Sequence, residues 1–346
     1  MGLHDLTILT ARDVESVVND ADLAVVLESQ AKVFVAYSSQ GSSPSNASAI
    51  QAPLRLSINT AQATTLYMPA RVDGLGTACK IVTLPKGGSV DGLPTTTIVQ
   101  DDDGVVRAVI NARSLTALRN ASGSALFLEN TQTATKPKNL VIFGSGTQAD
   151  FHARIILRRF PSISSCRIVV RRITDRSQSL QESLHKLLPQ VDFSLHESKG
   201  ATEPGQDLST VVAEADIIVT VTPSTEALFS TSLVSPGTRL VLVGSYKPEM
   251  REVEDALIRR AGIVVVDSKT ACGHEAGELI STGIKPYGML ELGEILSGQT
   301  QTTPGAGGDV ILFKSVGLGI QDVAISQLVY NEAAKRGLGT VVYNYD

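Results

Sequence analysis

The chain has 346 residues, of which 42% are hydrophobic and 19% charged, and its formal net charge is −5. This composition is too apolar for a disordered or collagen-like protein, and the length exceeds what one hydrophobic core usually supports, so we expect two globular domains. The acidic balance argues against nucleic acid as the principal partner and favours small-molecule ligands.

The first predicted domain covers residues 1–130. Apolar residues at helical spacing predict a helix from about Asp13 to Tyr37, followed by a Ser/Gly/Pro-rich loop from Ser38 to Ser48. Short β-rich runs between Leu54 and Ile110, separated by Gly and Pro, predict a mostly antiparallel sheet. A further helix is expected from about Ser114 to Leu128. Alternating runs such as Leu54-Arg55-Leu56-Ser57-Ile58 can expose an apolar face, so we expect this α+β domain to form a dimer contact.

The second predicted domain covers residues 131–308. Its runs NLVIFG, CRIVVR, ADIIVTVT, RLVLVG and GIVVVD are almost continuously apolar and alternate with helical or loop segments. Such runs indicate parallel strands buried on both faces, so the fold class is α/β with a Rossmann-type doubly wound sheet. Residues 309–346 are interpreted as a turn and a helix that return to the first domain and complete it.

A glycine-rich phosphate loop, Gly144-Ser145-Gly146-Thr147-Gln148-Ala149, follows the strand LVIF and opens a helix. Gly144 permits the tight turn, and Gly146 lets the backbone approach a pyrophosphate. Ala149 allows the helix to pack closely on the strand. The helix N-terminus supplies amide donors and a positive dipole, so a dinucleotide is the predicted cofactor, bound by Gly144, Gly146, Thr147 and Gln148.

The second strand of this domain ends without the carboxylate that commonly binds the ribose of NAD. Arg171 and Arg172, together with Arg176, favour NADP(H), because the planar guanidinium suits a phosphate. NAD(H) stays open, since Asp175 can fold back to the ribose, or the arginines can simply be solvated on a surface turn.

The N-terminus lacks a basic region followed by an apolar one, and no apolar run approaches the roughly 20 residues of a membrane span. The cysteines Cys79, Cys166 and Cys272 form no C-x-x-C pair, which is typical of reduced thiols. The histidines show no metal-binding spacing. We therefore expect a cytoplasmic protein with no membrane partner and no metal.

The sequence resembles the ornithine cyclodeaminase/mu-crystallin family from about Ala52 to Gly339. The segments that carry the resemblance occur in the family's order: APLRLSI, LYMPA, TACKIVTLP, GLPTT, LTALRNASGSAL, VIFGSGTQAD, ADIIVTVT, PGTRLVLVGSYKPEMREV and LFKSVGLGIQDVA. Any one of them is a weak signal, whereas their collinear spacing is specific. The resemblance also implies that the first domain binds substrate and that a homodimer forms through it.

The resemblance implies that Arg55, Lys80 and Arg119 face the substrate, bind its carboxylate and polarise its nitrogen or an adjacent oxygen. Independently, a lysine on the apolar strand CKIVTL would be costly to bury unpaired, which suggests a site or a salt bridge. The family's cofactor contacts correspond here to Thr95, Asn120, Thr147, Gln148, Thr222, Val243, Gly244 and Ser315.

Two departures from the family pattern affect the predicted reaction. Ornithine cyclodeaminases carry a catalytic Asp soon after the Val-Gly of the fifth strand, where this chain has Val243-Gly244-Ser245-Tyr246, and residues 247–252 resemble the ketimine reductases of the mu-crystallin branch. The family's Arg-Thr-Ala-Ala also becomes Arg119-Asn120-Ala121-Ser122, which alters a cofactor contact.

We therefore predict NAD(P)H-dependent reduction of a small carboxylated, cyclic ketimine or imine to the amino acid. Cyclodeamination needs a base, and a phenol with a reference pKa of about 10 is a poor one at neutral pH. Imine reduction needs a carboxylate clamp, a protonated C=N bond and a cofactor hydride. The alternatives are an alanine-type amino acid dehydrogenase, a cyclodeaminase that uses Glu275 or Glu278, and a non-catalytic NADP-dependent small-ligand-binding protein.

Overall fold

The computed structural model describes residues 4–39, 49–87, 92–131, 133, 135–198, 206–298, 300 and 308–345. The chain divides into two compact units, one of Met1–Ser122 with Gly317–Asp346 and the other of Gly123–Val316. These divisions differ from the predicted ones at residues 130 and 308. They differ because helix α3 (Arg113–Glu129) crosses from the first unit into the second, and because strand β15 (Val310–Lys314) belongs to the second.

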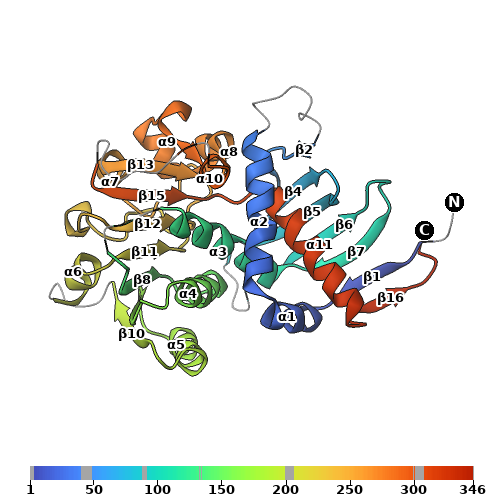
Figure 1. Ribbon diagram of the computed structural model, residues 1–346, viewed down its shortest axis with the longest axis horizontal. Coiled ribbons are helices and arrows are strands. Elements are labelled where there is room, and N and C mark those ends of the chain that lie inside the picture. The colour runs from blue at the N-terminus through green and yellow to red at the C-terminus, as the bar shows by residue number, and fades with distance from the viewer. Residues whose placement is uncertain are drawn as a thin grey trace. The chain divides into compact units, whose positions relative to one another are not determined.

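The first unit is built on a sheet in the order β16-β1-β7-β6-β5-β4-β2, with β3 also paired to β4 (Figure 1). Its strands are β1 (Leu6–Leu9), β2 (Ile50–Gln51), β3 (Leu56–Asn59), β4 (Ala63–Val72), β5 (Gly76–Pro85), β6 (Thr95–Gln100), β7 (Val106–Asn111) and β16 (Thr340–Val342). The pairs are antiparallel except for β1 with β7, which confirms the predicted mostly antiparallel sheet.

The single helix predicted from Asp13 to Tyr37 is wrong at its middle, where the structure has two helices. Helix α1 (Ala11–Asp20) ends at Ala21, whose ψ of 134° is extended, and α2 (Leu23–Ser38) begins after Asp22. The Asp22 carboxylate accepts a hydrogen bond from the Ala24 N–H at 2.8 Å. Aspartate is a favoured N-cap residue, so a new helix begins here although the apolar spacing continues across the break. Most of the loop predicted after this segment lies outside the described residues.

Helices α2 and α11 (Gly319–Lys335) lie side by side over one face of this sheet, as Figure 1 shows in blue and red. Alternation along β4 and β5 turns Met68, Ala70 and Lys80 to the buried side. The start of α11 comes so close to β4 that a Cβ at Gly319 would lie 2.8 Å from the Ala70 Cβ. The charged Lys80 is therefore buried on the side of the sheet where β5 contacts α11.

The second unit is built on a parallel sheet in the order β10-β9-β8-β11-β12-β15-β13-β14, which confirms the predicted Rossmann-type α/β class. Its other strands are β8 (Asn139–Phe143), β9 (Ser165–Val170), β10 (Asp192–Glu197), β11 (Ile217–Thr220), β12 (Arg239–Leu242), β13 (Ala261–Val266) and β14 (Leu290–Glu291). The strand order reverses between β8 and β11, and doubly wound folds bind ligands at that switch point.

The last segment was predicted to be a turn that leads into a helix. The helix is present as α11, but Val310–Lys314 before it form β15 between β12 and β13 and not a turn. All five side chains of β15 are buried, and Phe313 stacks on Phe127 of α3 with ring centroids 5.2 Å apart. A short apolar run flanked by glycines does not by itself distinguish a strand from a buried turn.

The remaining helices of this unit are α4 (Thr147–Arg159), α5 (Asp175–Leu187), α6 (Gln206–Ala213), α7 (Asp255–Arg260), α8 (Lys269–Glu275), α9 (Gly277–Thr282) and α10 (Leu292–Leu296). Among its described residues, 3-10 turns are present at η3 (Thr231–Leu233) and η4 (Pro286–Gly288). In the part of the chain that the structure describes, no helix has the length and apolarity needed to cross a membrane.

Candidate functional site

Two basic side chains pair with one buried carboxylate in the first unit, and a third lies near them. Lys80 Nζ on β5 lies 3.0 Å from Asp322 Oδ2 on α11, and Arg119 Nε on α3 lies 3.2 Å from Asp322 Oδ1. All three side chains are only 3% exposed. We call Arg55, Lys80, Arg119 and Asp322 the cation cluster. A single carboxylate thus stabilises two buried cations, which would be unfavourable if left unpaired.

A polar network orients the Arg119 guanidinium. Its Nη1 donates to Gln321 Oε1 at 3.0 Å and to Asn120 Oδ1, and the Gln321 side-chain amide donates back to the Arg119 carbonyl at 3.1 Å. Gln321 also accepts from the Leu318 N–H at 3.2 Å. Gly317, with φ of +83°, lies so close that a Cβ there would meet the guanidinium. These contacts hold Arg119 in one orientation.

Arg55 joins the cluster from the segment that precedes β3. Its Nη2 donates to the Gly317 carbonyl at 3.2 Å, and its charge acts on Lys80. The structure therefore brings together the three residues predicted to face substrate. With three basic groups around one carboxylate, the cluster carries an excess of positive charge, which favours an anionic ligand group such as a carboxylate.

Burial is the main cause that lowers the pKa of Lys80 to about 7, and the positive charges of Arg119 and Arg55 act in the same direction. The Asp322 carboxylate opposes them by stabilising the ammonium. Lys80 can therefore exchange a proton near neutral pH, as a general acid or base must.

Asp322 and Gln321 were not predicted from the sequence. Both lie on α11 among the buried residues Ile320, Val323 and Ala324, so they are polar side chains on an otherwise apolar helix surface. That pattern was the available signal, because a buried lysine and arginine require a buried carboxylate somewhere in the chain.

The phosphate loop in the second unit has the geometry that its sequence predicts. Gly144 has φ of +124°, and a Cβ there would lie 3.1 Å from Val221. Gly146 is the N-cap of α4 and provides no side-chain cap, so the first amides of the helix are available to a phosphate. A Cβ at Gly146 would lie 3.0 Å from Arg176 Nη2. Bare helix amides beside a guanidinium fit a dinucleotide pyrophosphate.

The first turn of α4 is fixed by a neutral histidine. Burial lowers the pKa of His152 to about 4, its Nδ1 lies 2.7 Å from the Gln148 carbonyl, and its Nε2 lies 2.9 Å from Ser124 Oγ. Because a carbonyl can only accept, Nδ1 carries the proton and Nε2 accepts from Ser124. Thr147 is the first residue of this helix, and the buried Gln148 Oε1 atom has no hydrogen-bond partner among the described residues.

Arg171 and Arg172 lie exposed on the turn after β9, and Asp175 begins α5. The same turn is held by Glu197, which accepts from the Ile173 N–H at 2.6 Å. The two arginines are therefore placed at the carboxyl end of the second strand of the Rossmann sheet, where the ribose of a dinucleotide is bound in such folds.

The other predicted cofactor residues are divided between the units. Thr222, Val243, Gly244 and Ser315 follow β11, β12 and β15 in the second unit, where Ser315 Oγ donates to Asp267 at 2.7 Å. Thr95 and Asn120 lie in the first unit, where Thr95 Oγ1 donates to the Leu93 carbonyl at 3.0 Å and Asn120 accepts from Arg119.

The carboxylates considered for a cyclodeaminase lie on α8 and α9. Glu278 is fully buried, accepts from Ser245 Oγ and from the Glu252 N–H at 2.9 Å, and lies 3.6 Å from Lys314 Nζ. The Glu278 oxygens are therefore occupied by groups of this chain. Glu275 is the last residue of α8. Among the described residues, no group of three or more His, Cys, Asp or Glu side chains is placed to hold a metal ion.

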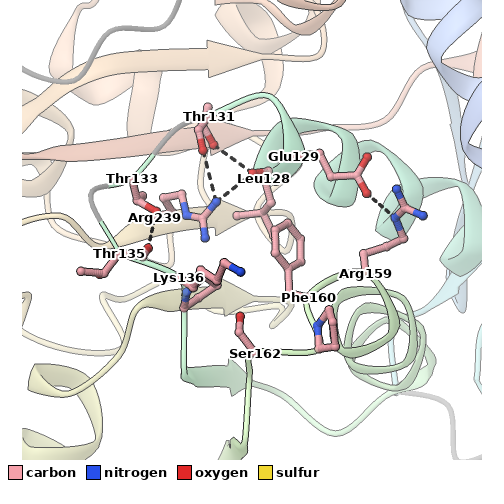
Figure 2. A pocket seen from close by; sticks show the side chains of 12 residues that line it. Leu128, Glu129, Thr131, Thr133, Thr135, Lys136, Arg159, Phe160, Ser162 and Arg239 are labelled. Carbon is pink, nitrogen blue, oxygen red and sulfur yellow. Dashed lines mark hydrogen bonds and ion pairs between the residues drawn. The ribbon is translucent and has the colours of Figure 1, made fainter.

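A pocket of about 410 Å³ lies where the parallel strands of the second sheet begin, at the end opposite the phosphate loop (Figure 2). Arg239, the first residue of β12, stacks 5.5 Å over Phe160 and donates to the carbonyls of Leu128 at 2.8 Å and Thr131 at 3.3 Å. In Figure 2 its guanidinium points toward these carbonyls near the end of α3. The pocket thus lies at the amino ends of the parallel strands, away from the phosphate loop at the carboxyl end of β8.

Comparison with known proteins identifies related sequences and a similar fold. The model of the ornithine cyclodeaminase/mu-crystallin family matches residues 5–337. An uncharacterized cyclodeaminase of Dictyostelium discoideum is 29% identical over 79% of this chain and 80% of its own. The ketimine reductase mu-crystallin of Mus musculus is 30% identical over 73% of this chain and 74% of its own.

Among solved structures, Thermococcus litoralis Δ1-pyrroline-2-carboxylate reductase, in complex with NADH and L-proline, has a TM-score of 0.82. It covers 96% of this chain and 99% of its own at 23% identity. At that identity the likeness bears on the fold, and it agrees with the predicted fold class.

The Asp322→Asn variant tests the electrostatics of the cation cluster. We expect the pKa of Lys80 to fall below about 7, because the anion that stabilises its ammonium is removed. The free energy of unfolding should decrease by about 3 to 5 kcal/mol, because buried cations lose their carboxylate. Urea unfolding measures the second effect. Glu332→Gln, which removes an exposed ion pair with Arg336 near the end of the same helix, should change stability far less; equal losses would contradict the assignment.

Proposed function

The chain belongs to the ornithine cyclodeaminase/mu-crystallin family, and on that premise we propose that it is an NAD(P)H-dependent reductase of small carboxylated ketimines. The substrate we favour is a cyclic ketimine, which is reduced at its C=N bond to the amino acid. The observation that carries the proposal is the buried cation cluster, in which a lysine with a pKa of about 7 lies beside two arginines. The relative from Mus musculus is named a ketimine reductase.

In the proposed reaction, Arg55 and Arg119 bind the substrate carboxylate. Nε and Nη1 of Arg119 contact Asp322, Asn120 and Gln321, so Nη2 is the nitrogen that we assign to the substrate. Because these contacts hold the guanidinium in place, little orientation is lost when the carboxylate binds.

Lys80 supplies the proton that the imine nitrogen takes up. NAD(P)H held at the phosphate loop of Gly144 and Gly146 would supply a hydride to the imine carbon, and that hydride together with the proton would convert C=N to CH–NH. In the reverse direction the neutral Lys80 accepts the proton. Asp322 holds both Lys80 and Arg119 by ion pairs.

A cyclodeaminase is the second candidate, because the Dictyostelium discoideum relative carries that name. Tyr246 occupies the position at which that reaction would use a carboxylate, and Glu278 is engaged by Ser245, Glu252 and Lys314. We therefore rank it below the reductase. A carrier without turnover would not need a buried lysine that titrates near neutral pH.

The unchanged protein should oxidise NAD(P)H when given a cyclic ketimine carboxylate and should form no proline from L-ornithine. Because protonated Lys80 is the proposed donor, kcat/KM for reduction should fall as the pH rises through about 7. Oxidation of the amino acid should increase over the same range, since it uses neutral Lys80. NAD(P)H absorbance measures ketimine reduction when it falls and amino acid oxidation when it rises. The amount of proline formed from ornithine measures cyclodeamination.

Two variants control this assay. Lys80→Met should lower kcat/KM by about 100-fold or more, as expected for loss of a general acid. Tyr246→Phe should cost much less, because hydride transfer does not require the phenol. Proline and ammonia formed from ornithine would contradict the proposal and would show that another carboxylate acts as the base.

We further propose that NADP(H) is preferred, because Arg171 and Arg172 lie at the ribose end of β9. The double variant to Ala should raise the KM for NADPH by about 10-fold or more, because charge-assisted contacts are lost, and should change the KM for NADH little. Arg176→Ala, beside Gly146 of the phosphate loop, should weaken both cofactors alike. Unchanged NADPH kinetics in the double variant would exclude this preference.

We also propose that the open face of the first sheet contacts a second copy of the chain. Leu56 and Ile58 of β3 are 66% and 58% exposed, and Leu56 pairs with Tyr67, which pairs with Ile81 on the same face. Exposed contiguous apolar side chains favour an interface. Leu56→Glu with Ile58→Glu should convert a dimer to a monomer in sedimentation at micromolar concentration. Val25→Glu, at an exposed valine of α2, should leave it dimeric, and a monomeric unchanged protein would refute the proposal.

A further inference from the structure

We propose that Glu252 is a positioning residue for the dinucleotide, whose buried carboxylate holds the loops after β11 and β12 in the shape that binds the nicotinamide half. The proposal rests on the proposed dinucleotide function of the second unit. No role was predicted for Glu252 from its position in the segment KPEMREV.

The Glu252 carboxylate is fully buried and accepts four hydrogen bonds. Its Oε1 accepts from the Thr222 N–H at 2.7 Å and from Thr222 Oγ1 at 2.8 Å. Its Oε2 accepts from the Gly244 N–H at 2.7 Å and from Thr220 Oγ1 at 2.8 Å. Each oxygen therefore accepts one backbone amide and one hydroxyl, and the two amides belong to different loops.

These loops lie at the carboxyl ends of adjacent parallel strands. The phosphate loop, which follows β8, lies at the same end of the sheet. Thr222 comes directly after Val221, and a Cβ at Gly144 of the phosphate loop would lie 3.1 Å from Val221. The backbone held by Glu252 is therefore in contact with the turn that receives the pyrophosphate.

The two loops also converge tightly on the carboxylate. A Cβ at Gly244 would collide with the Thr222 carbonyl oxygen and with Glu252 Oε1, so no larger residue fits there. The backbone of Glu252 is anchored in turn, since its N–H donates to Glu278 Oε1 at 2.9 Å. Lys314 Nζ donates to Ser245 Oγ at 2.8 Å, which places a buried cation beside these two carboxylates.

Doubly wound folds consist of two mononucleotide-binding halves. The half containing β8, β9 and β10 carries the arginines assigned to the adenine side, whereas β11 and β12 belong to the other half. Glu252 acts on β11 and β12, so its loss should weaken binding of the nicotinamide nucleotide more than binding of the adenine nucleotide.

Glutamine is the informative substitution because it has the shape of glutamate but only one acceptor oxygen. The glutamine side chain that Glu252→Gln introduces can take two orientations. In one of them its NH₂ group faces the Thr222 N–H, and in the other it faces the Gly244 N–H, so two donors meet in either case. One loop then keeps a buried amide without an acceptor and must move or take up water. The side-chain volume stays the same, so the variant removes one hydrogen-bond acceptor without creating a cavity.

The test measures dissociation constants for NADPH, NADH and adenosine 2′,5′-bisphosphate, which represents the adenine half alone. Binding is followed by fluorescence or calorimetry, so no turnover is required. Glu252→Gln should raise the Kd of the dinucleotides by about 10-fold or more and leave that of the bisphosphate within about 2-fold. An unchanged dinucleotide Kd, or equal losses for all three ligands, would overturn the positioning role.

Asp216→Ala is the matched control for general destabilisation. Asp216 Oδ2 accepts the N–H groups of Lys138 at 2.7 Å and Asn139 at 2.9 Å, at the opposite edge of the same sheet. This variant also deprives two amides of a carboxylate acceptor, so it should lower the melting temperature and leave all three dissociation constants unchanged. A rise in the dinucleotide Kd in Asp216→Ala equal to that in Glu252→Gln would overturn the proposal.

If Glu252→Gln does not fold, Thr220→Val provides the same test with a smaller change. It removes only the hydroxyl that donates to Oε2 and should raise the dinucleotide Kd about 3-fold. No change in that Kd would overturn the inference. Failure of the unchanged protein to bind any dinucleotide would overturn the proposed function and this inference with it, whereas normal binding with unaffected variants overturns the inference alone.

Discussion

Burying charge is the constraint around which both units are arranged. In the first unit the Asp322 carboxylate neutralises Lys80 and Arg119, which lie on different elements and would be strongly unfavourable in the interior without it. The ion pairs tie α11 to β5 and α3, so that the same contacts that permit burial also set the positions of the reactive groups. The low exposure of Lys80 then shifts its pKa into the range useful for proton transfer.

The second unit uses buried carboxylates in a different way. Glu252 and Asp267 accept backbone amides, and each oxygen of both residues receives one N–H. Loops at the carboxyl ends of parallel strands have no partner strand to satisfy their amides, so a side chain must do so. Placing the acceptors beneath the loops leaves the outer surface of those loops for a ligand.

The sequence predicted what depends on local pattern and left out what depends on long-range pairing. The parallel strands and the turn at Gly144 follow from apolar runs and glycine spacing, and both are present. Arg55, Lys80 and Arg119 were grouped only through the family resemblance, because nothing in their spacing places them together. Asp322 was missed, since its partner Lys80 is far away in the chain. The break before α2 was missed because apolar periodicity continues across Asp22.

The place of β15 in the second sheet bears on how the protein folds as it is made. This strand lies between β12 and β13, although it follows both in the chain. A nascent chain that ends before residue 310 has no strand to join β12 to β13, and it also lacks α11 and the Asp322 that pairs with Lys80. Neither unit can therefore be completed before this segment is made, and until then the emerging chain carries unpaired strand edges at β12 and β13. Such edges are prone to aggregate, so folding of both units depends on the arrival of β15 and α11.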